Sequence, residues 1–218
     1  MIQMVSQEYV IDPPIRGYWT IYNPPGHPPL AFDFLAVDEN KSLYNKGNFL
    51  RHLISTISVD DTCAWSRPVY SPVDGVVVES LNTKKDRKNL SFIYDLVSLF
   101  KNKPIVSDGF GAFGGNHIMI RAGDIFVLLC HLRQESLRVQ KGDIVRIGQR
   151  IGEVGNSGSS IQPHLHLQVM NNNHYFPLFA NLLPYKFSKG KIKQHGAWIL
   201  HHDFALKNRG HYLFESDS

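Results

Sequence analysis

The chain has 218 residues, of which 43% are hydrophobic and 19% are charged, so it can bury a substantial core and fits a single domain over residues 1–218. The 23 lysine and arginine residues exceed the 19 acidic residues by only four, and no stretch interleaves basic and aromatic residues, so nucleic-acid binding is not favoured. No run of about 20 apolar residues predicts a transmembrane segment.

The N-terminal stretch MIQMVSQEYVIDPPIRGYW has no positively charged start, no continuous apolar run and no small-residue cleavage site. It therefore does not predict a secretory signal peptide. We expect a cytoplasmic location unless a leader has been removed or another export route is used. The two cysteines, Cys63 and Cys130, could form one disulfide bond but do not make a disulfide framework.

Most of the chain between about residues 20 and 186 has the pattern of short strands. Apolar and polar residues alternate or form β-branched runs, and Gly, Pro, Asn or Asp ends each run. The runs are LAFDFLAVD (30–38), RPVYSPVDGVVVESL (67–81), NHIMIRAGDIFVLLCHL (116–132), DIVRIGQRIGEVG (143–155) and HLHLQVM (164–170). We expect a mainly antiparallel β fold, with a tight hairpin turn at AGD (122–124) and a C-terminal extension over residues 187–218.

Two stretches interrupt this pattern with apolar residues at helical spacing. They are NKGNFLRHLISTIS (45–58) and KKDRKNLSFIYDLVSLFKN (84–102). Both predict amphipathic helices inserted between strands.

The run QPHLHLQVM (162–170) places two histidines one residue apart. Alternation along a strand predicts that His164, His166 and Gln168 share one face, while the apolar residues between them face the core. The two histidine Cα atoms would lie about 6.6 Å apart, so both rings could reach one metal ion, or one could bind the metal and the other contact its water. Taken alone, the motif also fits two half-exposed strand histidines.

A further histidine, His131, ends the predicted strand IFVLLCHL (125–132). Alternation places it on the same face as Ile125, Val127 and Leu129, all of them apolar. A buried, hydrogen-bonded core histidine is the simplest interpretation of this residue alone.

His27 and Asp33 lie on either side of a Pro-Pro turn in GHPPLAFDF (26–34). An isolated carboxylate between two phenylalanines is costly to bury, which favours a cationic partner, although backbone amides at a turn would serve as well. Two neutral imidazoles and one carboxylate are the protein ligands of a catalytic zinc site that keeps one position for water. The residues alone do not decide which two of the four histidines, His27, His131, His164 and His166, would bind the metal.

Four motifs, GHPPLAFDF, VYSPVDGVVV, CHL and LRVQKGDIVRIGQRIGEVGNSGSSIQPHLHLQV, occur in this order along the chain. They resemble the lysostaphin-type (LytM-like) zinc endopeptidases, which cleave peptide stems or cross-links of bacterial peptidoglycan. The resemblance extends with gaps from about His27 to Met170. It implies an antiparallel β-sandwich of the duplicated-hybrid, or barrel-sandwich, type and a Zn²⁺-dependent hydrolase acting on peptidoglycan peptides.

Carried over position by position, the resemblance implies that His27, Asp33 and His166 bind zinc. His131 and His164 would then be the catalytic pair that orients or deprotonates the water and stabilises the tetrahedral intermediate.

Two other classes of function stay open. The run KGDIVRIGQRIG also resembles lipoyl, biotinyl and sugar-phosphotransferase carrier domains, but no lysine turn flanked by methionine is present, and a carrier does not explain Asp33. A non-catalytic relative could bind cell wall or a partner protein through the same groove. Because all five polar positions of the motifs are kept, we favour the enzyme.

Overall fold

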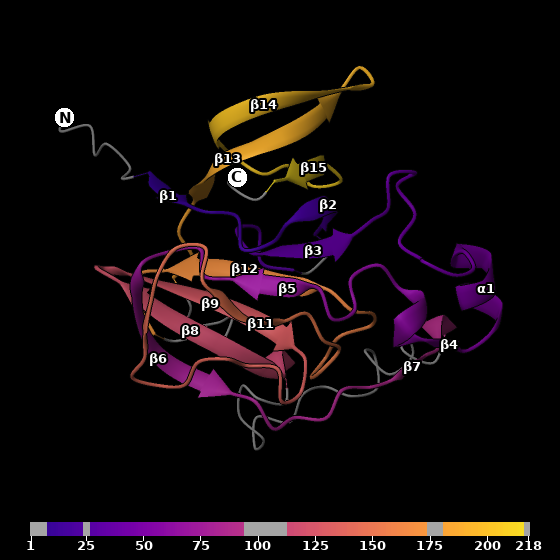
Figure 1. The fold of residues 1–218 in the computed structure, drawn as a ribbon, viewed down its shortest axis with the longest axis horizontal. Helices are drawn as coiled ribbons and strands as arrows, with labels where there is room; N and C mark the ends of the chain where they lie inside the picture. The colour runs from indigo at the N-terminus through magenta and orange to yellow at the C-terminus, as the bar shows by residue number, and fades with distance from the viewer. Residues whose placement is uncertain (1–7, 24–26, 94–112, 174–180, 216–218) are drawn as a thin grey trace.

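The computed structural model describes residues 8–23, 27–93, 113–173 and 181–215, and strands dominate it (Figure 1). In the N-terminal half, the strands are β1 (Tyr9–Ile11), β2 (Gly17–Tyr22), β3 (Phe32–Ala36), β4 (Ile57–Ser58), β5 (Pro68–Tyr70), β6 (Gly75–Leu81) and β7 (Asn89–Leu90). In the C-terminal half, they are β8 (Asn116–Ala122), β9 (Ile125–Leu132), β10 (Ile144–Val145), β11 (Arg150–Glu153), β12 (Leu165–Met170), β13 (Tyr185–Gln194), β14 (Ala197–Phe204) and β15 (His211–Phe214). The helix α1 (Phe49–Ile54) and a 3₁₀ turn (Val59–Asp61) lie between β3 and β5.

One long sheet joins most of these strands in the order β1-β13-β15-β2-β3-β12-β9-β8-β6-β10, with β14 also paired to β13. Its neighbouring strands are antiparallel, apart from β1 and β13, which are parallel. The pairs β5/β11 and β4/β7 form two small separate sheets. The mainly β expectation is therefore confirmed, whereas the duplicated-hybrid sandwich type stays a prediction.

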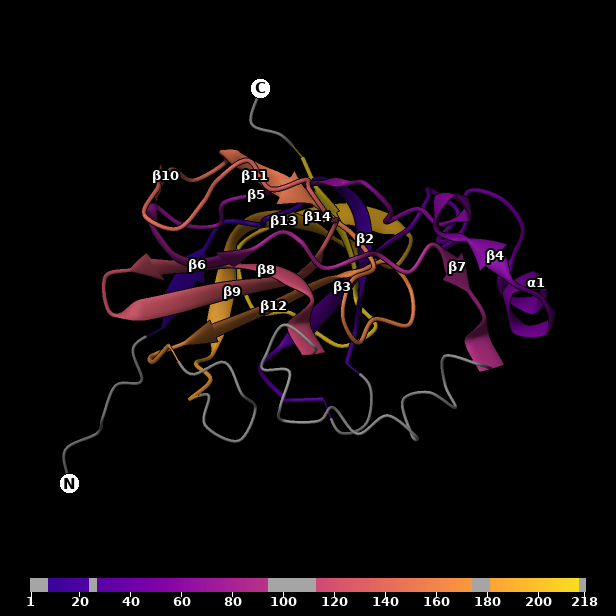
Figure 2. The same ribbon diagram turned by 90° about the horizontal axis from the view of Figure 1, so that it is seen from below.

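Alternation along the central strands β9 and β12 separates an inner face from a second face. The inner face packs into the main core together with residues of β5 and β11, which lie on one side of these strands (Figure 2). The residues concerned include Val69, Val127, Leu129, Ile151, Leu165, Leu167 and Val169. On the second face, Leu128, Cys130 and Met170 form a smaller apolar cluster. His166 lies on the same face of β12 as Met170 and pairs with Cys130 of β9. Both cysteines are buried free thiols.

The tight turn expected at residues 122–124 is confirmed. Ala122 pairs with Ile125 across the β8/β9 hairpin, so the loop contains only Gly123 and Asp124. Gly123 has a φ of +61°, a conformation that glycine adopts without the steric cost of a side chain.

The two expected helical insertions differ from the structure. In the first, α1 has only six residues, beginning after Asn48, whose side-chain oxygen accepts the Arg51 N–H at 3.0 Å. In the second, residues 84–91 are not helical, Phe92 and Ile93 are, and residues 94–102 lie outside the described residues. Residues 57–58 and 89–90 were therefore wrongly predicted as helical. They form the paired strands β4 and β7, and the burial of Ile57 and Leu90 in this pairing stabilises the strands more than the helical spacing of nearby apolar residues would stabilise a helix.

Most of the expected C-terminal extension joins the long sheet. β13 pairs with β1, β14 and β15, and β15 pairs with β2. Five aromatic residues from β13, β14 and β15 pack into the main core, namely Tyr185, Phe187, Phe204, Tyr212 and Phe214. Within the described part of the chain, no helix is long and apolar enough to cross a membrane.

Candidate metal centre

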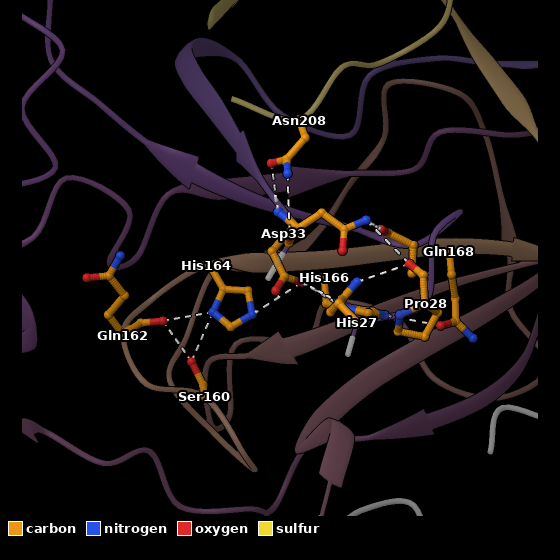
Figure 3. A network of polar contacts seen from close by, with 11 residues as sticks. His27, Pro28, Asp33, Ser160, Gln162, His164, His166, Gln168 and Asn208 are labelled. Atoms are coloured by element: carbon orange, nitrogen blue, oxygen red, sulfur yellow. Dashed lines mark hydrogen bonds and ion pairs between the residues drawn. The ribbon is translucent and has the colours of Figure 1, made fainter. Parts of the chain in front are cut away.

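Three ligand atoms from two neighbouring strands and the preceding loop converge on one point (Figure 3). His27 Nε2 lies 3.2 Å from His166 Nδ1 and 3.3 Å from Asp33 Oδ1, and His166 Nδ1 lies 2.8 Å from Asp33 Oδ1. A tetrahedral zinc ion with bonds of about 2.0–2.1 Å requires ligand atoms about 3.3 Å apart. The spacing of the three atoms therefore fits one face of a zinc coordination tetrahedron.

The hydrogen bonds behind the two histidines also favour a cation at this point. His27 Nδ1 lies 3.2 Å from the Pro28 carbonyl oxygen, and His166 Nε2 lies 3.1 Å from Gln168 Oε1, so these acceptors place each neutral ring's proton on the far nitrogen. Nε2 of His27 and Nδ1 of His166 then present lone pairs towards each other and towards the carboxylate of Asp33. Three converging lone pairs need a proton or a metal ion between them, so the donor set fits zinc.

Strand register brings His166 and Asp33 together. On the antiparallel strands β12 and β3 the two residues are direct cross-strand partners, and Cys130 of β9 is the partner of His166 on the other side. Their chain neighbours Phe34 and Leu165 point into the core, which anchors both strands. The alternation predicted for QPHLHLQVM is therefore confirmed, since the imidazole of His166 lies opposite the core face.

A polar clamp holds the segment between the first two ligands. Asn23, at the end of β2, donates from its side chain to the Pro28 and Ala31 carbonyl oxygens at 3.4 and 3.2 Å. Asn208, in the loop between β14 and β15, accepts the Asn23 N–H at 3.0 Å and donates to the Asn23 carbonyl oxygen at 3.2 Å. The C-terminal strands thus help to fix the loop between His27 and Asp33 (Figure 3).

His131 lies on the same side as the candidate ligands, not on the core face that strict alternation predicted. Asn116 of β8 pairs with Leu132, but Ile118 pairs with Leu129, so β9 contains one extra residue at this point. His131 has a φ of +61°, and this β-bulge turns its ring towards His164, with the ring centroids 4.5 Å apart. The sequence-based face assignment was wrong because a bulge reverses alternation.

His131 and His164 are oriented in the same way. His131 Nδ1 lies 2.9 Å from the Ser157 carbonyl oxygen, and His164 Nδ1 lies 2.8 Å from the Gln162 carbonyl oxygen. Because a carbonyl oxygen only accepts, each Nδ1 carries the ring proton and each Nε2 is left with a lone pair. His164 Nε2 lies 3.6 Å from Asp33 Oδ1, next to the candidate ligands.

Burial and mutual charge set the ionisation of the cluster. Burial lowers the pKa of His131 and of His164, and although the Asp33 carboxylate opposes this shift, burial together with the neighbouring imidazoles keeps both pKa values below the ordinary histidine value, which favours neutral rings. Burial would also lower the pKa of His166, but its hydrogen bond to Asp33 and the charge of that carboxylate outweigh burial and raise it. For Asp33, burial raises the pKa, whereas His164, His166 and His27 together hold it well below its ordinary value.

The loop that carries the Ser157 carbonyl is itself fixed by buried polar groups. The Ser157 hydroxyl accepts the Asn116 N–H at 2.9 Å and donates to the Leu132 carbonyl oxygen at 2.8 Å. The Gly155 N–H donates to the His131 carbonyl oxygen at 2.9 Å. A Cβ at Gly155 would lie 2.4 Å from the Arg133 backbone, so this close crossing requires glycine.

The remaining histidines in the described part of the chain do not join the site. The competing cluster HHDF lies on β14, where His202 is exposed and His201 contacts Gln194. His52 contacts the Tyr44 hydroxyl at 2.9 Å, away from the ligands.

Sequence reasoning missed the supporting roles of Gln168, Ser157 and Asn208. Gln168 could have been found from the i, i+2 spacing that places it beside His166. Ser157 contacts His131, 26 residues away in the sequence, and Asn208 contacts Asn23, 185 residues away. Contacts between such distant residues are not visible in a local sequence pattern.

Residues 58–177 match the family described as peptidase family M23. The chain is 30% identical over 103 residues to the peptidoglycan DD-endopeptidase ShyA of Vibrio cholerae serotype O1, and this match spans 47% of the chain and 17% of that relative. Among solved structures, the catalytic domain of the antimicrobial peptidase lysostaphin from Staphylococcus simulans is 20% identical, with a TM-score of 0.41 over 77% of this chain and 88% of that one. The catalytic domain of the prophage-encoded M23 protein EnpA from Enterococcus faecalis is 16% identical, with a TM-score of 0.41 over 76% and 87%.

The family match covers more than half of the chain and includes three of the five expected site residues, His131, His164 and His166. His27 and Asp33 precede the matched residues, and the strand pairing of β3 with β12 brings Asp33 to His166. The chain belongs to peptidase family M23.

Proposed function

We propose that the chain is a zinc-dependent endopeptidase that hydrolyses peptide bonds in the stems or cross-links of bacterial peptidoglycan. The observation that carries this proposal is the convergence of three lone-pair donors, His27, Asp33 and His166, beside two further neutral imidazoles. Family membership and the similarity to a peptidoglycan DD-endopeptidase support the substrate class. Acting on this substrate places the proposed site of action outside the cytoplasm.

In the proposed mechanism, His27, Asp33 and His166 hold the metal. A bound zinc ion supplies Lewis acidity, which polarises the scissile carbonyl and makes a water molecule more acidic. Asp33 stays ionised because the surrounding imidazoles lower its pKa, so the site keeps its negative ligand. Gln168 keeps the ring of His166 turned with Nδ1 towards the metal position.

His131 and His164 are the proposed catalytic pair. Both rings are neutral and both present the lone pair of Nε2, so either one can accept a proton from the attacking water. The ring that takes up this proton then carries an N–H at Nε2, which can stabilise the negative charge on the carbonyl oxygen or return the proton to the leaving amine. The hydrogen bonds from Nδ1 to backbone carbonyl oxygens hold both rings in place for these transfers.

A test of this function combines metal content with hydrolysis. Purified chain without a histidine tag is analysed for zinc and incubated with muropeptides, and the products are separated by mass. We expect near one zinc per chain and cleavage within the peptide stems or cross-links. If the chain binds zinc but cleaves no muropeptide, the proposed enzymatic activity is contradicted and a non-catalytic, wall-binding function is favoured. If the chain binds no zinc even after reconstitution, the proposed metal site is contradicted.

A further inference from the structure

The C-terminal strands concentrate the positive charge of the chain. Residues 185–215, here called the basic module, contain six lysine and arginine residues and two acidic residues, a net charge of +4. The rest of the chain contains 17 basic and 17 acidic residues and is neutral. In Figure 1 the hairpin of β13 and β14 in this module projects away from the strands that carry the metal centre. The small positive excess of the whole chain is therefore located in this C-terminal segment.

One side of this module faces solvent. Along these strands, aromatic residues such as Phe187, Tyr212 and Phe214 point into the main core. The opposite side of β2, β15, β13 and β14 therefore faces solvent, and we call it the outer face. The register pairs Lys193 with Trp198 and His211 with Thr20. Lys193 Nζ lies 5.3 Å from the Trp198 ring centroid, and the Tyr18 ring lies 5.4 Å from the Trp198 ring.

The lysines of this region differ in their ion pairing. Lys186 and Lys191 form ion pairs with Glu8 and Glu215, both at 2.6 Å. Among the described residues, however, no carboxylate lies within ion-pair distance of Lys193 or of Lys41, the two lysines whose charges act on His211.

His211 lies close to both of these lysines. Burial lowers its pKa, and the positive charges of Lys41 and Lys193 lower it further. Its Nδ1 is buried without a hydrogen-bond partner in the described part of the chain. The outer face thus combines two ammonium groups that have no ion-pair partner among the described residues with two partly exposed aromatic rings.

We propose that the outer face binds an anionic polysaccharide, with its acidic groups at Lys41 and Lys193 and its sugar rings against Tyr18 and Trp198. Charge complementarity supports an anion, and the adjoining aromatic rings offer flat apolar surfaces that suit a pyranose ring. The choice of a glycan over another polyanion rests on the proposed function, in which the substrate is itself part of a glycan polymer.

The module is also tied to the metal centre. Asn208, in the loop between β14 and β15, bonds to Asn23, which holds the segment between His27 and Asp33. A glycan on the outer face would therefore be held by the same strands that support the metal-ligand loop.

The test measures binding of the full chain to hyaluronan oligosaccharides, with neutral chitin oligosaccharides of equal length and duplex DNA for comparison. We expect hyaluronan to bind most tightly and its affinity to fall with salt. The double variant Lys41→Ala/Lys193→Ala should weaken this binding about three- to tenfold, and Trp198→Ala should also weaken it. The control Lys85→Ala/Lys141→Ala removes the same charge from exposed positions elsewhere and should have little effect.

Three outcomes would overturn the proposal: an equal loss in the control variant, undiminished binding by the Lys41/Lys193 variant, or tighter binding to DNA than to hyaluronan. Thermal unfolding of each variant verifies that it is folded. The same measurements on His166→Ala separate this proposal from the proposed function, because that variant should lose zinc and cleavage but keep hyaluronan binding.

Discussion

His166 and Asp33 are direct cross-strand partners on β12 and β3, and His166 Nδ1 lies 2.8 Å from Asp33 Oδ1. The strand ladder itself therefore sets the distance between two of the candidate ligands. His27 comes from the loop before β3 and completes the set only when that loop is held in place.

Replacement of a ligand and replacement of a catalytic histidine should have different effects. His166→Ala removes one of three donor atoms and should abolish zinc binding, whereas His164→Ala should keep near one zinc per chain and lose turnover by at least about a hundredfold. Elemental analysis and muropeptide cleavage check both. The variant His201→Ala/His202→Ala is the control and should resemble the parent in both measurements. Zinc-free His164→Ala protein would overturn this division of roles.

Removal of the metal should destabilise the fold. A ligand that binds only the native state stabilises it by about 4 kcal/mol at a thousandfold excess over its Kd, so excess chelator should lower the Tm of the zinc-loaded chain. Differential scanning calorimetry with and without chelator measures this shift. His166→Ala should show no such response, and an equal shift in that variant would mean that the chelator acts elsewhere.

Zinc affinity should fall as the solution becomes acidic. The hydrogen bond to Asp33 and its charge outweigh burial and raise the pKa of His166 above the ordinary histidine value, so in solutions more acidic than this raised pKa a proton occupies the nitrogen that would bind zinc. Above the raised pKa the nitrogen is free and affinity should level off. Below it, the apparent Kd should rise about tenfold per pH unit, because one proton must leave as zinc binds. Competition with a chromophoric chelator across this range gives the slope, and a flat profile would contradict the assignment of His166.

The clamp between Asn208 and Asn23 should contribute to metal affinity without touching the metal. Asn208→Ala removes two hydrogen bonds to Asn23, which loosens the segment between His27 and Asp33. We expect zinc to bind about tenfold more weakly, as for other supporting residues of metal sites. Asn40→Ala, at an exposed turn position, is the control. Unchanged zinc affinity in Asn208→Ala would show that the loop keeps its shape without the C-terminal strands.

Local sequence patterns predicted the parts of the site that depend on strand alternation. The faces of His166 and Gln168 followed from their spacing, and the hairpin turn followed from a glycine in a two-residue loop. His131 was assigned to the wrong face because the bulge that turns it depends on the pairing of β8 with β9. The helices predicted to include residues 57–58 and 89–90 were wrong at these positions for a similar reason, since the pairing of β4 with β7 is a contact between distant residues.

Ser157 should act as a positioning residue for His131. Its hydroxyl bonds Asn116 and Leu132, which fixes the carbonyl oxygen that receives the His131 Nδ1 proton. In Ser157→Ala the loop can shift, and a displaced imidazole should lower kcat about 10- to 100-fold while KM changes little. Zinc content should stay near one per chain, because no metal ligand depends on this hydroxyl. Ser159→Ala, in the same loop, is the matched control and should keep the parent kcat. Loss of zinc together with kcat would show that Ser157 supports the whole site, and an unchanged kcat would show that the loop positions His131 without it.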